Sequence, residues 1–129
     1  MNSLGFLAVG LGAAIGAWLR WALSLYLNSL HSYVAIGTLL ANLIGAFVIG
    51  AALAFFSLSN QVNETLRLFL VTGLLGGLTT FSSFSAESLV LLQKGQWAWA
   101  LLHSLLHIAG SLLLCFLGYL SWRTFSELL

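Results

Sequence analysis

The residues best placed to do chemistry lie in the polar segment 73–85, within an otherwise apolar chain. Phe81 and Phe84 are three residues apart, so they project from one face of a helix. The edge of an aromatic ring is positive, and two such edges could replace part of an anion's hydration shell. Hydroxyl donors surround the pair, among them Thr79, Thr80, Ser82, Ser83 and Ser85. The pattern favours a site for an anion, although packing by the rings and hydroxyl bonds to carbonyls one turn earlier are the ordinary alternatives.

Glycines at positions 73, 76 and 77 precede the hydroxyl-rich run. Glycine weakens helical continuity, and an interrupted membrane helix exposes carbonyl groups that can bind a cation and N–H groups that can face an anion. Close packing between helices is the competing explanation for the same glycines. The small-residue patterns at Gly12 and Gly16, and at Gly37, Ala41 and Gly45, point to close helix packing as well.

Asn42 lies in the middle of a second apolar segment, one turn after Thr38. An amide supplies two N–H donors and one acceptor. It could join two helices by a hydrogen bond worth about 0.6–2 kcal/mol, or it could offer a donor to a permeating ion. Both readings stay open from the residues alone.

A last apolar segment carries His103, His107 and Ser111 at intervals of four residues, on one helical face. Two histidines at this spacing can bind a metal, but the chain has one cysteine and we expect no nearby carboxylate to complete a set of ligands. We therefore favour a pore-lining or hydrogen-bonding role for His107 and Ser111, whereas His103 could extend to the membrane interface. Arg20 and Glu87 lie about two turns from the ends of their segments and either reach the interface or line an aqueous vestibule.

The composition identifies the element type that must position these residues. The chain has 129 residues, of which 60% are hydrophobic and 5% are charged, whereas soluble domains carry about 25% charged residues. The formal net charge of +1 gives no reason to expect a nucleic-acid partner. No nucleophile–base arrangement, carboxylate pair or phosphate-binding loop is present, so we expect no enzyme activity. An integral membrane protein fits best.

Four apolar segments are each long enough to cross a bilayer as a helix, which needs about 20 residues. They cover residues 4–27, 34–58, 66–92 and 97–122, so we predict one all-α, four-helix transmembrane domain over residues 1–129. With four spans, Arg67 and Arg123 share one side of the membrane, and Arg20 and Lys94 share the other. The positive-inside rule then has no bias to act on. The charges allow either one orientation fixed by a partner or insertion in both directions as an antiparallel homodimer.

The sequence resembles the Fluc/CrcB family of small fluoride channels over nearly its whole length. The resemblance rests on Gly16-Ala-Trp-Leu-Arg20, Gly37-Thr with Asn42 and Gly45, the block from Gly76 to Glu87, and Gly110-Ser111. The block in the third segment is the specific part. Where the family usually reads Thr-Thr-Phe-Ser-Thr-Phe, Ser83 replaces the last threonine and keeps its hydroxyl.

The resemblance implies a dual-topology antiparallel homodimer with two fluoride pores, in the inner membrane of a bacterial cell. It implies passive export of cytoplasmic fluoride. It also implies an interrupted third helix whose Gly76 and Thr79 carbonyls, from both subunits, hold a central structural sodium ion. Arg20 would be the vestibule arginine, and the pore residues would be Asn42, Thr80, Phe81, Ser83, Phe84, His107 and Ser111.

Two other functions fit four short spans. A small multidrug-type proton-coupled antiporter would need a buried carboxylate in its first span, and residues 4–27 contain none. A structural membrane subunit would explain the glycine packing, but it gives no reason for a hydroxyl–aromatic cluster beside Asn42. The fluoride channel is therefore the favoured prediction.

Overall fold

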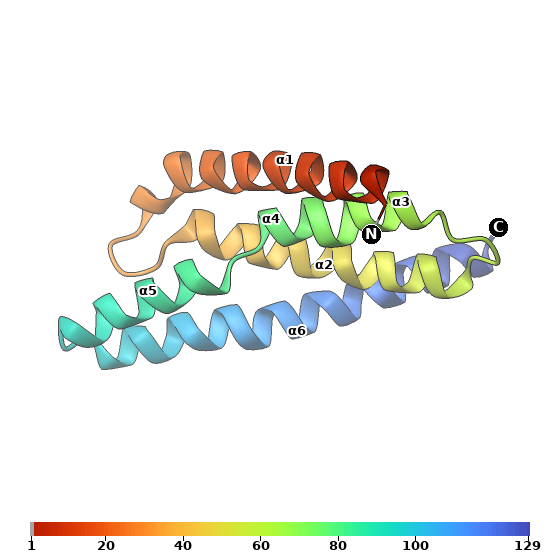
Figure 1. Ribbon diagram of the computed structural model, residues 1–129. Helices are drawn as coiled ribbons and strands as arrows, with labels where there is room; N and C mark the ends of the chain where they lie inside the picture. Colours follow the sequence, from red (N-terminus) through yellow and green to blue (C-terminus); the bar gives the residue numbers. More distant parts are fainter. Residues whose placement is uncertain (1) are drawn as a thin grey trace.

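The computed structural model describes residues 2–129, and the regular structure in this part of the chain is helical (Figure 1). Four helical segments are long and apolar enough to cross a membrane, which confirms the predicted all-α, four-span class. The elements are α1 (Ser3–Leu27), η1 (Asn28–Leu30), α2 (Ile36–Leu58), α3 (Glu64–Arg67), η2 (Leu68–Leu75), α4 (Gly76–Leu78), α5 (Phe81–Gln93) and α6 (Trp97–Glu127). Together, α3, η2, α4 and α5 form the third spanning segment, Glu64–Gln93.

The helix ends differ from the predicted spans by a few residues, for local reasons. The third segment begins at Glu64 because Asn63 caps it, with its side chain accepting the N–H of Leu66 at 3.0 Å. The last helix continues to Glu127, five residues beyond the predicted 122, and Arg123 pairs there with Glu127 at 3.5 Å. Such i,i+4 pairs support a helix outside an apolar segment.

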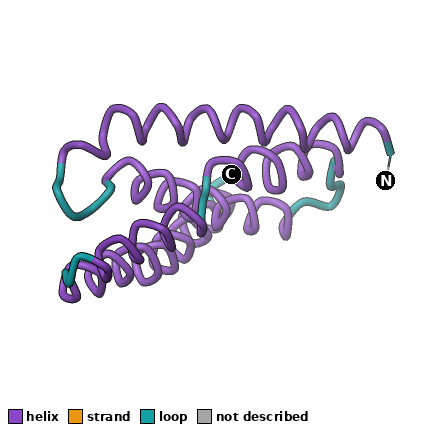
Figure 2. The backbone as a smooth tube through the Cα atoms, turned by 60° about the vertical axis from the view of Figure 1, so that its left-hand side comes forward, coloured by secondary structure: helices purple, strands orange, loops and turns teal. Residues whose placement is uncertain are grey.

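The third segment changes its hydrogen bonding twice along its length. η2 is a π-helix over Leu68–Leu75, a form that is rare at this length and often found near functional sites. Regular helix stops after Leu78: Thr79 has φ −83° and ψ 153°, and Thr80 has φ −150° and ψ 121°. α5 then starts at Phe81, and Figure 2 shows the short non-helical piece between two helical parts.

Close approach between α1 and the third segment depends on glycine. A Cβ atom on Gly73 would lie 3.0 Å from the Cα of Gly12, and one on Gly77 would collide with the carbonyl oxygen of Ala13. Around Gly76 the space is open, with the nearest such atom 3.8 Å away. The packing explanation therefore holds for Gly73 and Gly77 but leaves Gly76 without a packing role.

The bundle is thin, and its apolar side chains point mostly outward. Its small buried cluster includes Ala41, Leu75 and Leu78, whereas Phe6 is 70% exposed and Trp18 is 65% exposed. The two described ends of the chain and the α2–α3 connector lie toward one end of the bundle, and the α5–α6 turn lies at the other (Figure 1). An apolar exterior of this kind suits a lipid bilayer rather than water.

Candidate functional site: a polar pocket at the break in the third segment

Asn42 of α2 makes three hydrogen bonds at the point where the third segment loses its helical pattern. Its Oδ1 accepts the N–H of Thr80 at 2.7 Å, and its Nδ2 donates to the carbonyl oxygen of Thr80 at 2.9 Å. The same Nδ2 lies 3.0 Å from Nδ1 of His107 on α6. The two bonds with Thr80 fix which end of the amide is oxygen, so Nδ2 donates to His107 and Nδ1 of that ring accepts. Asn42 thus joins three parts of the bundle.

The hydroxyl groups near the break make two kinds of hydrogen bond: some cap the start of α5, and others bond to a backbone carbonyl one turn earlier. Thr80 is the N-cap of α5: its side chain accepts the N–H of Ser83 at 3.1 Å and donates to the Ser83 hydroxyl at 3.1 Å. Thr79 and Ser85 donate instead to the carbonyls of Leu75 and Phe81, each at 2.8 Å. The bonds to carbonyls one turn earlier, which were the alternative from sequence, therefore occur for Thr79 and Ser85 only.

Phe81 and Phe84 lie side by side, with ring centroids 5.4 Å apart, but their surroundings differ. Phe84 is buried at 8% exposure, and its ring lies 4.9 Å from the ring of His107 and 5.5 Å from that of His103. Phe81 is 76% exposed in the single chain. One ring therefore belongs to the interior of the bundle and the other faces outward.

A pocket of about 530 Å³ opens beside these groups. The predicted site residues that line it are Asn42, Gly76, Thr79, Thr80, Phe81, Phe84, His107 and Ser111. Two others do not line it: Ser83 on α5 bonds to Thr80, and Arg20 donates from Nε to the carbonyl oxygen of Gly77 at 3.1 Å. Arg20 thus contacts the C-terminal end of α4, close to the break.

The carbonyl groups near the break differ in how they are used. Within residues 2–129, no hydrogen bond reaches the carbonyl oxygens of Gly76 or Thr79. The normal i+4 donor for Gly76 is the N–H of Thr80, which Asn42 takes instead. Both carbonyls therefore lack a donor within the described residues, whereas that of Gly77 accepts from Arg20.

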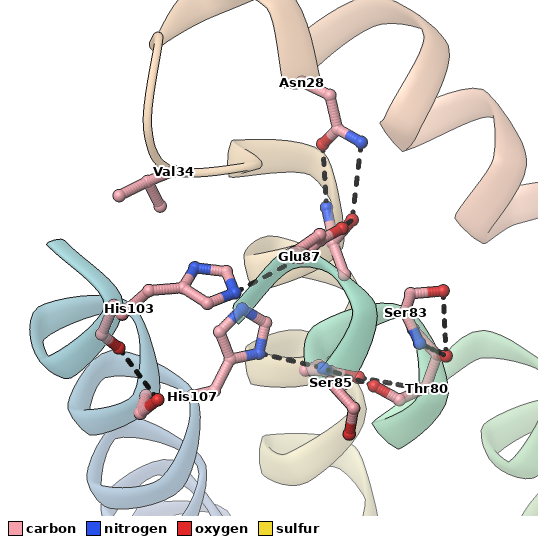
Figure 3. Close-up of polar contacts among 12 residues, drawn as sticks. Asn28, Val34, Thr80, Ser83, Ser85, Glu87, His103 and His107 are labelled. Atoms are coloured by element: carbon pink, nitrogen blue, oxygen red, sulfur yellow. Dashed lines mark hydrogen bonds and ion pairs between the residues drawn. The ribbon is translucent and has the colours of Figure 1, made fainter. Parts of the chain in front are cut away.

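A second polar cluster, which sequence reasoning missed, lies beyond Phe84. Glu87 on α5 has Oε2 3.3 Å from Nε2 of His103, and its Oε1 accepts the Thr38 hydroxyl at 2.7 Å. Asn28 then accepts the backbone N–H of Thr38 at 3.1 Å. Figure 3 shows Glu87 pointing from α5 toward the histidines of α6.

This cluster corrects two expectations. The expectation that no carboxylate lies near the histidine pair is wrong, because the α5–α6 hairpin brings Glu87 to it although 16 residues separate Glu87 from His103. The expectation that His103 extends to the interface is also wrong, since its side chain is 0% exposed. The one feature of the sequence that could have indicated this contact is Glu87 itself, a single acidic residue within the apolar segment 66–92.

Comparison with known proteins agrees with the arrangement of helices and pocket. Proteins named fluoride-specific ion channel FluC include one from Aromatoleum aromaticum, 53% identical over 125 residues, 95% of this chain and 95% of that protein. Another, from Cupriavidus pinatubonensis, is 52% identical over 123 residues, 95% and 98% of the two chains. A third, from Pseudomonas putida, is 56% identical over 112 residues, 87% and 88% of the chains.

A family model matches residues 7–119, and its description is CrcB-like protein, Camphor Resistance (CrcB). The match includes most of the first spanning helix, all of the second and third, and most of the fourth. With four helices able to cross a bilayer, the protein is a multi-pass membrane protein. The chain belongs to the CrcB-like family.

Proposed function

We propose that the protein is a fluoride-selective ion channel that lets cytoplasmic fluoride leave the cell passively. The observation that carries the proposal is the likeness to fluoride-specific ion channels over 95% of the chain, together with a donor-rich pocket at the break in a spanning helix. The relatives' names describe channels and not enzymes. We place the protein in the inner membrane of a bacterium.

The break supports an anion pathway on electrostatic grounds. α5 begins at Phe81 beside the pocket, and the first N–H groups of a helix lack partners within it and carry partial positive charge. Thr80, Phe81 and Phe84 line the pocket at this helix end. Their hydroxyl and ring-edge groups would add to that field.

Selectivity follows from the size and hydration of the ion. Fluoride is small and tightly hydrated, so its path must offer several donors at short range. Asn42, Ser111 and His107 line the same pocket, and Ser83 lies next to Thr80. An ion entering the pocket would compete with His107 for the Nδ2 hydrogen of Asn42. Chloride is larger and makes weaker hydrogen bonds, so it would not compensate for that loss.

We further propose that two copies associate antiparallel and form two pores. Phe81 is 76% exposed although it lines the pocket, so one chain leaves this wall incomplete. Basic residues are also balanced between the two ends of the bundle, which suits insertion in both directions. The interrupted third segments of the two copies would then meet near the membrane centre.

A sodium ion fits the unpaired carbonyls at this position. Gly76 and Thr79 would hold it through backbone oxygens, the donor type that hard cations prefer. One chain offers only these two oxygens, so a second copy would complete the set. The ion would supply positive charge and join the breaks structurally. Arg20, bonded to Gly77 nearby, would add positive charge to the vestibule.

The two other candidate functions gain no support. Residues Ser3–Leu27 contain no acidic side chain, which a proton-coupled antiporter of the small multidrug type would require. A structural subunit would need neither the pocket nor the buried histidines beside it.

Efflux from liposomes tests the proposal. Purified protein is reconstituted into vesicles loaded with equal potassium fluoride and potassium chloride, and each anion is followed with its own electrode after valinomycin is added. We expect rapid fluoride efflux and chloride efflux no faster than from empty vesicles. Equal efflux of both anions would refute selectivity, and no fluoride efflux from dimeric, folded protein would refute the channel.

A further inference from the structure

Glu87, His103 and His107 form a cluster with the geometry of a metal site, beyond the proposed fluoride function. One ligand atom from each residue lies within 4.8 Å of the others. The carboxylate comes from α5 and the two imidazoles from successive turns of α6. Figure 3 shows the three side chains converging between these helices. Three ligands from two packed helices suffice to bind one ion and leave a position open.

The cluster contains polar atoms without partners. Among residues 2–129, the buried atoms that make no hydrogen bond include Oε2 of Glu87, both ring nitrogens of His103 and Nε2 of His107, and the first of these faces Nε2 of His103 at 3.3 Å. His103 is 0% exposed and His107 is 4% exposed. Buried polar groups are nearly always hydrogen-bonded, so a carboxylate and two imidazoles that face one another without hydrogen bonds have atoms available for a shared ligand. We propose that this cluster binds a divalent transition-metal ion of the zinc class.

The donor types select this class of ion. Two imidazoles and one carboxylate suit zinc and its neighbours, whereas sodium, magnesium and calcium prefer oxygen donors alone. The site is therefore distinct from the carbonyl oxygens of Gly76 and Thr79. Thr38 donates to Oε1 of Glu87 at 2.7 Å and so holds the carboxylate with Oε2 directed at the histidines. Hydrogen-bonded supporting groups of this kind orient metal ligands in proteins.

A metal ion could enter the cluster past the carboxylate of Glu87. The Glu87 side chain is 25% exposed, whereas the His103 side chain is fully covered. An ion could therefore meet Glu87 first and then the imidazoles. The single negative charge of Glu87 would partly neutralise the ion, which matters because unpaired charge is costly at this depth.

Metal binding would change the contact between His107 and Asn42. Nδ1 of His107 accepts from Asn42, so Nε2 carries the ring proton when no ion is bound. An ion bound at Nε2 replaces that proton, which then resides on Nδ1. With a proton on Nδ1, the ring no longer accepts the Asn42 hydrogen, and this contact must open. Binding is thus coupled to the pocket beside the helix break.

Cobalt(II) provides a direct spectroscopic test, because its visible absorption is intense in four- or five-coordinate protein sites and weak in water. Cobalt is titrated into the dimeric protein in detergent, purified without a histidine tag. We expect an intense band at one equivalent per chain, which zinc abolishes by displacement. Only a weak, aqueous-type spectrum would overturn the proposal.

Variants assign the signal to the cluster. His103→Gln and Glu87→Gln should each lose the band, whereas His31→Gln should keep it, because His31 lies in the connector between α1 and α2. A band that survives both cluster substitutions, or that disappears with His31→Gln, would overturn the assignment. If the variants fail to fold, X-ray absorption of the cobalt-bound natural protein replaces them: two imidazole nitrogens per ion are expected, and none or one would contradict the site.

A flux measurement tests the coupling to Asn42, and this part rests on the proposed function. Fluoride efflux is first measured without metal and then with zinc on both sides of the vesicles. We expect zinc to slow efflux at least tenfold and His103→Gln to remove the zinc effect. Zinc binding with unchanged efflux would overturn the coupling alone. Absent efflux before zinc is added would count against the channel function instead.

Discussion

Asn42 is the residue on which the arrangement at the break depends. Its amide pairs with both backbone groups of Thr80, a residue whose N–H and carbonyl lie outside regular helix. Its remaining amide hydrogen reaches His107 on another helix. A single side chain therefore satisfies a backbone interruption that would otherwise be costly inside a membrane. The sequence left open whether Asn42 joins helices or serves an ion. The hydrogen bonds in the structure show that it joins helices, and its role toward an ion stays a proposal.

Removing the amide should destabilise the fold. In Asn42→Ala, the N–H of Thr80 loses its acceptor, and an unsatisfied buried donor costs about 1–3 kcal/mol. We expect a clearly lower midpoint of thermal unfolding, measured in detergent by loss of the folded peak in size-exclusion chromatography. Ser121→Ala is the matched control, since Ser121 donates only to the Leu117 carbonyl of its own helix. Equal midpoints for the two variants would contradict the role assigned to Asn42.

Phe81 and Phe84 allow a pore role to be separated from a packing role. Phe81 is 76% exposed in one chain, so Phe81→Ile should leave the chain's own packing intact, whereas Phe84→Ile disturbs a buried site. If ring edges stabilise the ion by about 0.5–1.5 kcal/mol each, losing one slows efflux by up to about tenfold. Fluoride efflux and thermal unfolding are measured together, with Phe6→Ile as the control. Normal efflux in folded Phe81→Ile would contradict its pore role.

At the scale of the elements, the third segment is the informative one. Its sequence predicted polarity, glycine and a possible interruption, because these residue types are visible directly. The π-helix at Leu68–Leu75 was not predictable, since Leu, Val and Phe are common in α-helices too. The contact of Glu87 with His103 was not predictable either, because it depends on how α5 and α6 face each other. Hydrophobic patterns give spans, but they do not give the rotation of one spanning helix against its neighbour.

A substitution at Gly77 of this segment can be compared with the same substitution at Gly10 of α1. In Gly77→Ala, the new methyl group meets the carbonyl oxygen of Ala13 on α1, and backbone cannot move aside cheaply. We expect loss of most folded protein. Gly10→Ala is the control, because nothing lies within 4 Å of its Cβ position, and alanine in a helix is favoured over glycine by about 0.5–1 kcal/mol.

Thermal unfolding and folded yield of both glycine variants check this prediction. Gly10→Ala should unfold at the same temperature as the natural protein or slightly above it. A folded Gly77→Ala protein of unchanged midpoint would mean that α1 and the third segment are not packed as closely as described.

At the scale of the whole molecule, charge is distributed evenly between the two ends of the bundle. Arg67 and Arg123 lie toward the end that holds the termini, where Glu64 and Glu127 pair with them. Arg20 and Lys94 lie toward the other end. The orientation signal in membrane proteins counts lysine and arginine and is little affected by acidic partners. With two basic residues at each end, the chain carries no net orientation signal. Adding a few lysines or arginines at one end should therefore decide the direction of insertion.

Directed changes in the connectors test whether both orientations are needed. Asn60→Lys with Gln61→Lys adds two charges at one end, and Gln93→Lys with Gln96→Lys adds two at the other. Each doubly substituted chain should insert in a single direction, because the added lysines remain on the cytoplasmic side. If the channel is an antiparallel homodimer, neither chain alone can form it. Fluoride efflux from cells should then fall to background for each variant and return when the two are expressed together. Full efflux from either variant alone, with its single orientation verified by labelling of an added external cysteine, would refute the antiparallel arrangement.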